Sequence, residues 1–325
     1  MKRSFWIAIL IFIGLLAIPI AFYWEKVSTI YTDPKHFFSV LFDAGGFLNI
    51  TWKVFLINLG LAGSLLLIEM IMVGWKQSAI KRLFNLRDRS VMGDVMCWLL
   101  SIFGLYDFFV LLSTLGIFYL LNGIIQSKLY LGFGESIGNP YLLFAIVFVL
   151  SDFKAYLWHL LMHKIRPFWE VHQYHHSATS FNLLTTSRGH FLGKAIQTVL
   201  DAFLFALVGA PPQVLVGLYL IKEVWGMWIH SGAQFNMGAL RYVLITPRMH
   251  KVHHSTDHKH FDKNFGTFFA FWDLLLGTYA APEEVKDIGV ENDPYNRRGF
   301  WYDMILGFKL FIKAFIPKSL READR

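Results

Sequence analysis

Long apolar runs set the strongest limit on the fold of this 325-residue chain. A helix of about 20 apolar residues crosses the roughly 30 Å hydrocarbon core of a bilayer and satisfies its own backbone hydrogen bonds there. The runs are Phe5–Trp24, Phe55–Trp75, Val95–Leu121 and Tyr141–Leu161, followed by two arms, Val199–Val208 and Val214–Ile229, around Pro211 and Pro212. They predict an all-α, multi-pass helical membrane protein in which the two arms form a hairpin with a short first arm.

The composition supports this class of protein. Apolar residues make up 55% of the chain and charged residues 16%, whereas about 25% charged residues is ordinary in soluble domains. The single cysteine, Cys97, has no partner within the chain, which excludes a disulfide-stapled secreted domain. The apolar content also excludes a disordered or collagen-like chain.

The basic residues predict the orientation in the membrane. We expect the first apolar run to be retained as a helix, because no small-residue cleavage site stands near Ala21. The net charge of +7 is concentrated in loops such as residues 76–89, which is typical of cytoplasmic loops, so we expect no nucleic acid partner. Counting the crossings places His159 and His230 near the cytoplasmic face of a bacterial inner membrane or the endoplasmic reticulum.

Histidines form the second constraining feature, since 12 of the 13 lie within residues 159–260. Eight of them form three boxes: His159-x3-His163, His172-x2-His175-His176 and His250-x2-His253-His254. Residues three and four apart share a face of a helix, so the first and last histidines of each longer box can hold one ion while the middle one reaches a neighbouring ion. One catalytic zinc site uses about three protein ligands. The boxes therefore predict two adjacent metal ions.

The residues alone do not determine which metal is bound, because imidazole suits Zn, Cu, Fe and Ni. The zinc protease pattern His-Glu-x-x-His is absent, since Leu160 follows His159 and Gln173 follows His172. Redox chemistry is favoured. Two alternatives stay open, namely a dizinc membrane lipid hydrolase or isomerase and a non-catalytic metal-binding membrane protein.

Residues 140–281 resemble the fatty acid hydroxylase/sterol desaturase superfamily of membrane non-haem diiron enzymes. The resemblance rests on the order of the three boxes and on the residues around them. These residues are Asp152 and Tyr156, Trp169, Ser177, Pro247, Ser255, Asn264-Phe265-Gly266, Trp272-Asp273 and Gly277-Thr278.

The resemblance implies two iron ions, with zinc a possible replacement on isolation. The implied ligands are His159, His163, His172, His175, His176, His230, His250, His253 and His254, where His230-Ser231-Gly232 matches the position of a further family histidine. The residues expected to orient these ligands by hydrogen bonds are Asp152, His190, Asp262, Asn264 and Asp273, with a structural role as the alternative for His190. His258 and His260 depart from the family pattern, and we expect them to be surface residues, with metal ligation as the alternative.

The resemblance also implies O₂-dependent hydroxylation or desaturation of an unactivated C–H bond in a membrane lipid such as a sterol, fatty acyl or sphingoid lipid. The sequence contains no haem, flavin or iron–sulfur motif, so an external ferredoxin-like or cytochrome-like donor is expected to supply electrons on the cytoplasmic side. We expect three regions: membrane helices and a basic loop in residues 1–139, the catalytic region in 140–281, and a tail in 282–325. The tail carries an interfacial amphipathic helix over Phe300–Phe315.

Overall fold

The computed structural model describes residues 44–103, 105–234 and 237–316. Within these ranges the fold is all-helical and contains no strand, apart from two isolated β-bridges. The α-helices are α3 (Ala44–Val73), α4 (Ala79–Leu83), α5 (Arg89–Ile102), α6 (Leu105–Ser113), α7 (Ile117–Lys128), α8 (Pro140–Lys164), α9 (Arg166–His176), α10 (Phe191–Val208), α11 (Pro212–Ile229), α12 (Pro247–His253), α13 (Phe271–Leu276) and α14 (Phe300–Ala314). The 3-10 helices are η1 (Trp75–Gln77), η2 (Phe133–Ser136), η3 (Leu183–Ser187), η4 (Gly238–Tyr242) and η5 (His258–His260). The predicted helix Phe5–Trp24 lies outside the described residues.

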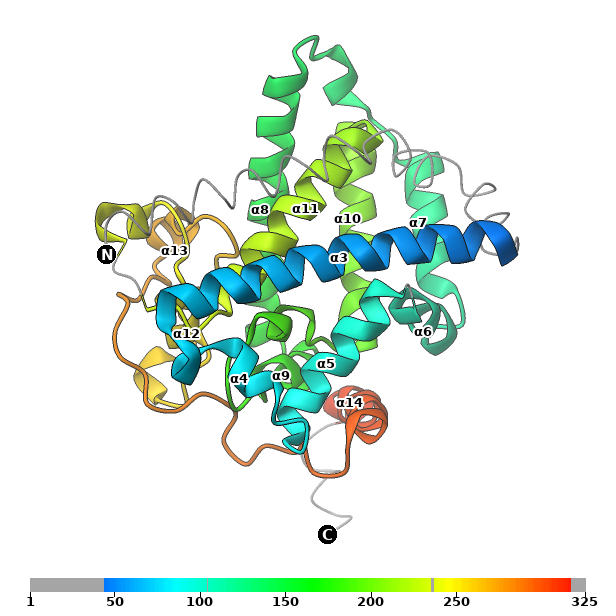
Figure 1. Cartoon of the computed structure of the whole chain (residues 1–325). Coiled ribbons are helices and arrows are strands. Elements are labelled where there is room, and N and C mark those ends of the chain that lie inside the picture. Colours follow the sequence, from blue (N-terminus) through cyan, green and yellow to red (C-terminus); the bar gives the residue numbers. More distant parts are fainter. Residues whose placement is uncertain (1–43, 104, 235–236, 317–325) are drawn as a thin grey trace.

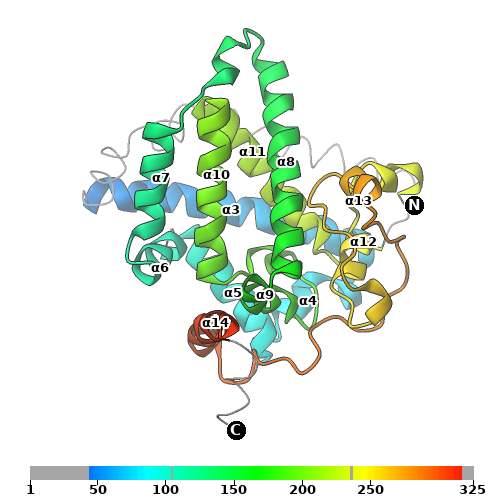
Figure 2. The same cartoon turned by 180° about the vertical axis from the view of Figure 1, so that it is seen from behind.

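The long helices α8 and α10 run side by side, with α7 against α10, and α11 packs obliquely against α8 (Figures 1 and 2). Of the described helices, α8 and α10 are long and apolar enough to cross a membrane. The predicted span Phe55–Trp75 is also helical, as the C-terminal part of α3, but α3 lies across the other long helices (Figure 1).

Local signals account for the limits of these helices. The Asn139 side chain accepts hydrogen bonds from the first backbone N–H groups of α8, and Pro140 occupies its first turn. Gly209 ends α10 in the left-handed region at φ 67°. The hairpin of α10 and α11 follows the prediction, but its first arm was predicted too short. The helix begins at Phe191 and has 18 residues, because the polar residues that interrupt the apolar run remain helical.

The apolar run Val95–Leu121 does not form one span, and this prediction was wrong. The structure divides the run among α5, α6 and α7. Between α6 and α7 the backbone enters the left-handed region at Leu115 (φ 51°) and Gly116 (φ 74°), which a continuous right-handed helix cannot accommodate. Hydropathy alone did not reveal this break.

The predicted C-terminal helix is present as α14, which packs against α9 and α5 (Figure 2). Phe300 and Met304 are buried in a core with Cys97 and Tyr174. Trp301, Ile305 and Ile312 are exposed, so one face of α14 is apolar and faces outward.

Candidate metal centre

The nine predicted histidines lie at the ends of four helices. α8 ends with His159 and His163, α9 carries His172, His175 and His176, His230 caps the C-terminus of α11, and α12 carries His250 and His253 with His254 as its C-cap. All nine side chains are buried or half-buried.

A sharp turn brings the first two boxes together. Ile165 is both the C-cap of α8 and the N-cap of α9, and Pro167 follows in the first turn of α9. Proline lacks an N–H and clashes with the preceding helical turn, so α8 cannot continue through it. The chain reverses, and the Nε2 atoms of His163 and His176 come within 3.0 Å.

The rings form two clusters, and within each cluster the ligand atoms all lie within 4.8 Å of one another. The five-histidine cluster contains His159, His163, His172, His176 and His253, and the four-histidine cluster contains His175, His230, His250 and His254. In each longer box, the first and last histidines share one cluster while the middle one belongs to the other. The helical spacing predicts this division.

Backbone carbonyl groups orient the rings through their Nδ1 atoms. His159 Nδ1 lies 2.8 Å from the Phe265 carbonyl oxygen, and His253 Nδ1 lies 2.7 Å from that of Lys263. His175 and His230 make the same contact with the carbonyls of Arg188 (2.9 Å) and Gly226 (2.7 Å). A carbonyl oxygen only accepts hydrogen bonds, so Nδ1 carries the proton in each ring and Nε2 keeps a free lone pair.

The positions of these lone pairs are those expected of ligands to a metal ion. His175 Nε2 and His230 Nε2 face each other at 3.4 Å, and two lone pairs at this distance repel unless a cation lies beside them. Two nitrogen ligands of one metal, each at about 2.1 Å, lie about 3–3.4 Å apart. The Nε2 atoms of His159, His172, His253 and His254 are buried without a hydrogen-bond partner in the described part of the chain, as expected of atoms that bind a metal.

The histidines of α9 and α12 favour their neutral, metal-binding form. Burial lowers the pKa of each far below its ordinary value of 6.5, and the neighbouring imidazoles lower it further. This holds for His172, His175, His176, His250, His253 and His254. A proton on any of these rings is costly in the folded chain.

Acidification should therefore destabilise the metal-free protein. Below pH 6.5 the unfolded chain binds protons at these histidines and the folded chain does not, so the free energy of unfolding falls as the pH falls. Thermal unfolding of chelator-treated protein should show a constant midpoint above about pH 7 and a decreasing one towards pH 5. A midpoint that stays constant over this whole range would contradict the burial of these rings.

The residues predicted to orient the ligands form hydrogen bonds mostly with backbone groups. Asp152 accepts hydrogen bonds from the backbone of Phe268 and Phe269 and from the Trp272 indole, each at 3.1 Å. Asn264 bonds to Ala280 and to the Met249 carbonyl. These contacts fix the chain that follows the third box.

Asp273 and Asp262 are each connected to a ring of the five-histidine cluster. Asp273 accepts hydrogen bonds from the N–H groups of Phe265 and Gly266, and the Phe265 carbonyl in turn orients His159. Asp262 Oδ1 lies 3.7 Å from His163 Nδ1, and the neighbouring His163 imidazole lowers the Asp262 pKa to about 2.

His190 has a structural role, which was the expected alternative to orienting a metal ligand. Its Nδ1 accepts the Leu192 N–H and caps α10, and its Nε2 donates to the Met304 carbonyl at 2.7 Å. It therefore ties α10 to α14.

His258 and His260 belong to neither cluster. His260 is buried against Glu283 (2.7 Å), so the expectation that it lies on the surface was wrong. The His258 side chain is 75% exposed and lies 3.3 Å from Glu291.

Replacing His258 with alanine should leave the metal content and the thermal stability unchanged, because an exposed pair contributes little. Metal analysis of the purified variant tests this expectation. Loss of metal would show that the η5 loop takes part in binding.

Three buried charged residues, Glu69, Asp94 and Arg188, were not predicted from the sequence to take part in the site. Glu69 on α3 accepts the N–H groups of Ala79 (2.6 Å) and Gly232 (2.5 Å), and so holds the turn after His230. Arg188 forms an ion pair with Asp94 in which neither side chain is exposed. A charge inside an apolar run was the available signal for Glu69, whereas no local signal pairs Arg188 with a residue 94 positions away.

Comparisons with known proteins agree with this site. Residues 144–278 match the model of the family described as fatty acid hydroxylase. The ornithine lipid hydroxylase of Rhizobium tropici is 29% identical over 164 residues, which cover 46% of this chain and 50% of the relative. The human alkylglycerol monooxygenase is 31% identical over 137 residues (42% and 30%), and the human cholesterol 25-hydroxylase is 31% identical over 142 residues (40% and 48%).

The matched segment spans half the length of these relatives or less. No solved structure shows a significant match to the chain. The family match contains all nine clustered histidines. Residues 144–278 therefore match the fatty acid hydroxylase family, which confirms the superfamily resemblance seen in the three boxes.

Proposed function

We propose that this chain is an O₂-dependent diiron oxidoreductase, a membrane monooxygenase that hydroxylates an unactivated C–H bond of a membrane lipid such as a sterol, fatty acyl or sphingoid lipid. The pair of adjacent all-imidazole clusters carries the proposal. The relatives named above are called hydroxylases or a monooxygenase, which favours hydroxylation over desaturation. Each of their names refers to a different lipid.

The proposed ligands are the nine clustered histidines, through the nitrogen atoms that face the two cluster centres. Two bound iron ions would supply O₂ activation and the oxidising power to remove hydrogen from a C–H bond. The chain itself holds the rings neutral by burial. It also fixes their orientation through the carbonyls of Phe265, Lys263, Arg188 and Gly226.

The two long apolar helices support access from the bilayer. α8 is long enough to cross it and ends at His159 and His163, so a lipid that lies against α8 can reach the clusters without passing through water. This arrangement suits an apolar substrate. We propose the same integral, multi-pass membrane placement for the whole chain.

The proposed orientation places the clusters on the cytoplasmic side, where a ferredoxin-like or cytochrome-like protein would deliver electrons. A reporter fused to the C-terminus should then signal from the cytoplasm. A periplasmic or lumenal signal would reverse the orientation.

Metal and product analysis test the function. The protein purified in detergent from iron-supplied cells should contain about two irons per chain. Cells that express it under isotope-labelled O₂ should accumulate a lipid with one labelled oxygen atom. A lipid product that forms without O₂ would favour the dizinc hydrolase or isomerase. Bound metal without any product would favour a non-catalytic metal-binding protein.

A further inference from the structure

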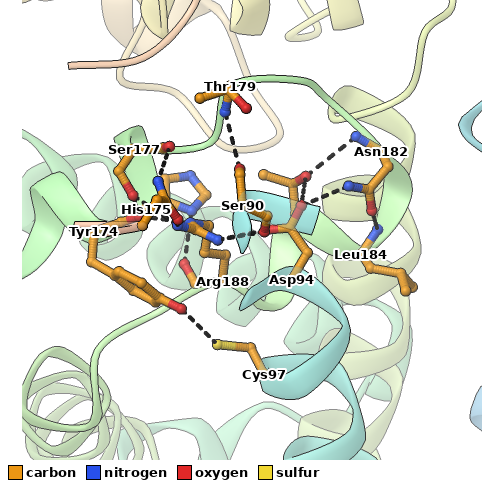
Figure 3. Close-up of polar contacts among 12 residues, drawn as sticks. Ser90, Asp94, Cys97, Tyr174, His175, Ser177, Thr179, Asn182, Leu184 and Arg188 are labelled. Atoms are coloured by element: carbon orange, nitrogen blue, oxygen red, sulfur yellow. Dashed lines mark hydrogen bonds and ion pairs between the residues drawn. The ribbon is translucent and has the colours of Figure 1, made fainter. Parts of the chain in front are cut away.

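The buried Arg188 guanidinium uses every hydrogen-bond donor that it has. Its Nε donates to the Tyr174 carbonyl at 2.8 Å. Its Nη1 donates to the Ser90 carbonyl (2.8 Å) and to Asp94 Oδ1 (3.1 Å), and its Nη2 donates to Ser177 Oγ (2.8 Å) (Figure 3). Nη2 also donates to Asn296 Oδ1 (2.7 Å). Arginine has five N–H donors, and five acceptors are present.

The surroundings of Arg188 are shaped for this side chain. The guanidinium lies 4.2 Å from the centre of the Tyr174 ring. A Cβ atom on Gly93 of α5 would lie 2.4 Å from Nη1, so this glycine provides the space that the guanidinium occupies. Asp94 is itself held by Asn182 (2.6 Å) and Thr185 (2.9 Å).

The same residue holds His175 in two ways. The Arg188 carbonyl accepts the His175 Nδ1–H at 2.9 Å. The Arg188 side chain bonds to Tyr174 and Ser177, which flank His175 and His176 at the end of α9. Figure 3 shows these contacts around the ring. A displaced guanidinium would therefore move both the ring and the carbonyl that orients it.

We propose that Arg188 is the positioning residue of the four-histidine cluster and that it sets the metal affinity of this cluster through His175. The inference rests on the proposed function in one respect, that the two clusters bind metal. The flanking bonds reach one ring of each cluster, His175 and His176, but the Arg188 carbonyl bonds to the His175 ring itself. The five-histidine cluster depends less on Arg188, because its His159 and His253 rings are oriented by carbonyls outside this network. If a variant weakens metal binding at one of the two sites only, Arg188 positions that site; if it merely supported the fold, both sites would weaken.

Cobalt(II) titration of the metal-free protein, followed by visible absorption, tests the proposal without relying on activity. The variant Arg188→Lys keeps the charge but offers three donors for five acceptors. We expect the unaltered chain to bind two equivalents. In the variant the four-histidine cluster should bind cobalt about 10- to 100-fold more weakly. The variant His175→Ala provides the reference spectrum for loss of this cluster.

Two further variants make the result decisive. Asn296→Ala removes one acceptor outside the helices and should weaken the same site by a smaller factor, which tests the proposal even if Arg188→Lys fails to fold. Asp262→Asn, beside His163, should instead affect the five-histidine cluster. Equal affinities in the unaltered chain and both network variants would overturn this inference alone, as would equal weakening of both sites. Absence of cobalt binding by the unaltered chain would overturn the proposed function and this inference together.

Discussion

Replacing His175 and His176 together with alanine should remove the metal from both sites, although the two residues are adjacent in sequence. His175 belongs to the four-histidine cluster and His176 to the five-histidine cluster. The double variant therefore removes one ligand from each. Iron(II) binds nitrogen ligands more weakly than copper or zinc, so the weakened sites should lose it during purification. We expect the iron content to fall from about two per chain to nearly none, with complete loss of lipid product.

The single variants make this expectation specific. His175→Ala should mainly empty the four-histidine cluster and His176→Ala the five-histidine cluster, which leaves about one iron in each case. His258→Ala is the matched control, because it removes an imidazole from the same region without touching a cluster. Two irons retained in the double variant would contradict the proposed ligands.

Replacing Asp273 with asparagine should strongly destabilise the protein. The Asp273 carboxylate accepts three hydrogen bonds, from Phe265 N (2.8 Å), Gly266 N (2.8 Å) and Thr278 Oγ1 (2.7 Å), and is fully buried. An amide of the same shape directs an NH₂ group at one of these donors. Loss of a charge-assisted bond and an unpaired buried donor together cost about 2–4 kcal/mol, which lowers the thermal midpoint of a chain of this length by about 3–6 °C.

The control for this prediction is the same chemical change at an exposed position. Asp257 caps η5 by accepting the Lys259 N–H, and asparagine caps a helix about as well as aspartate. Asp257→Asn should therefore have little effect on the midpoint. The Asp273 variant should also bind metal more weakly at the five-histidine cluster, because the Phe265 carbonyl orients His159. A normal midpoint would show that the loop from Phe265 to Thr278 does not depend on this carboxylate.

Periodicity accounts for what the sequence could predict. The helical spacing within His172–His176 and His250–His254 was enough to predict how the histidines divide between two clusters. The apolar runs predicted α8, α11 and the position of the hairpin. Both signals are local, so one sequence is sufficient to recognise them.

The unpredicted features depend on contacts between distant parts of the chain. Backbone carbonyls orient the rings, and a carbonyl has no signature in the sequence. Asp152 and Asp273 were expected beside the rings but bond to the backbone of loops that become adjacent only in the folded chain. The break at Leu115 also lies in an apolar run, where hydropathy does not distinguish one long helix from three short ones.

The length of α8 bears on which carbon of a lipid can react. His159 lies 19 residues after Pro140 in this helix, about 28 Å along its axis, which is close to the thickness of the hydrocarbon core. With α8 across the bilayer, as proposed, the clusters lie at the depth of the lipid head groups. A lipid that remains in its leaflet presents its uppermost carbons there, whereas a carbon at the bilayer midplane must rise about 15 Å to react. The vertical position of the substrate would then select the reacting carbon.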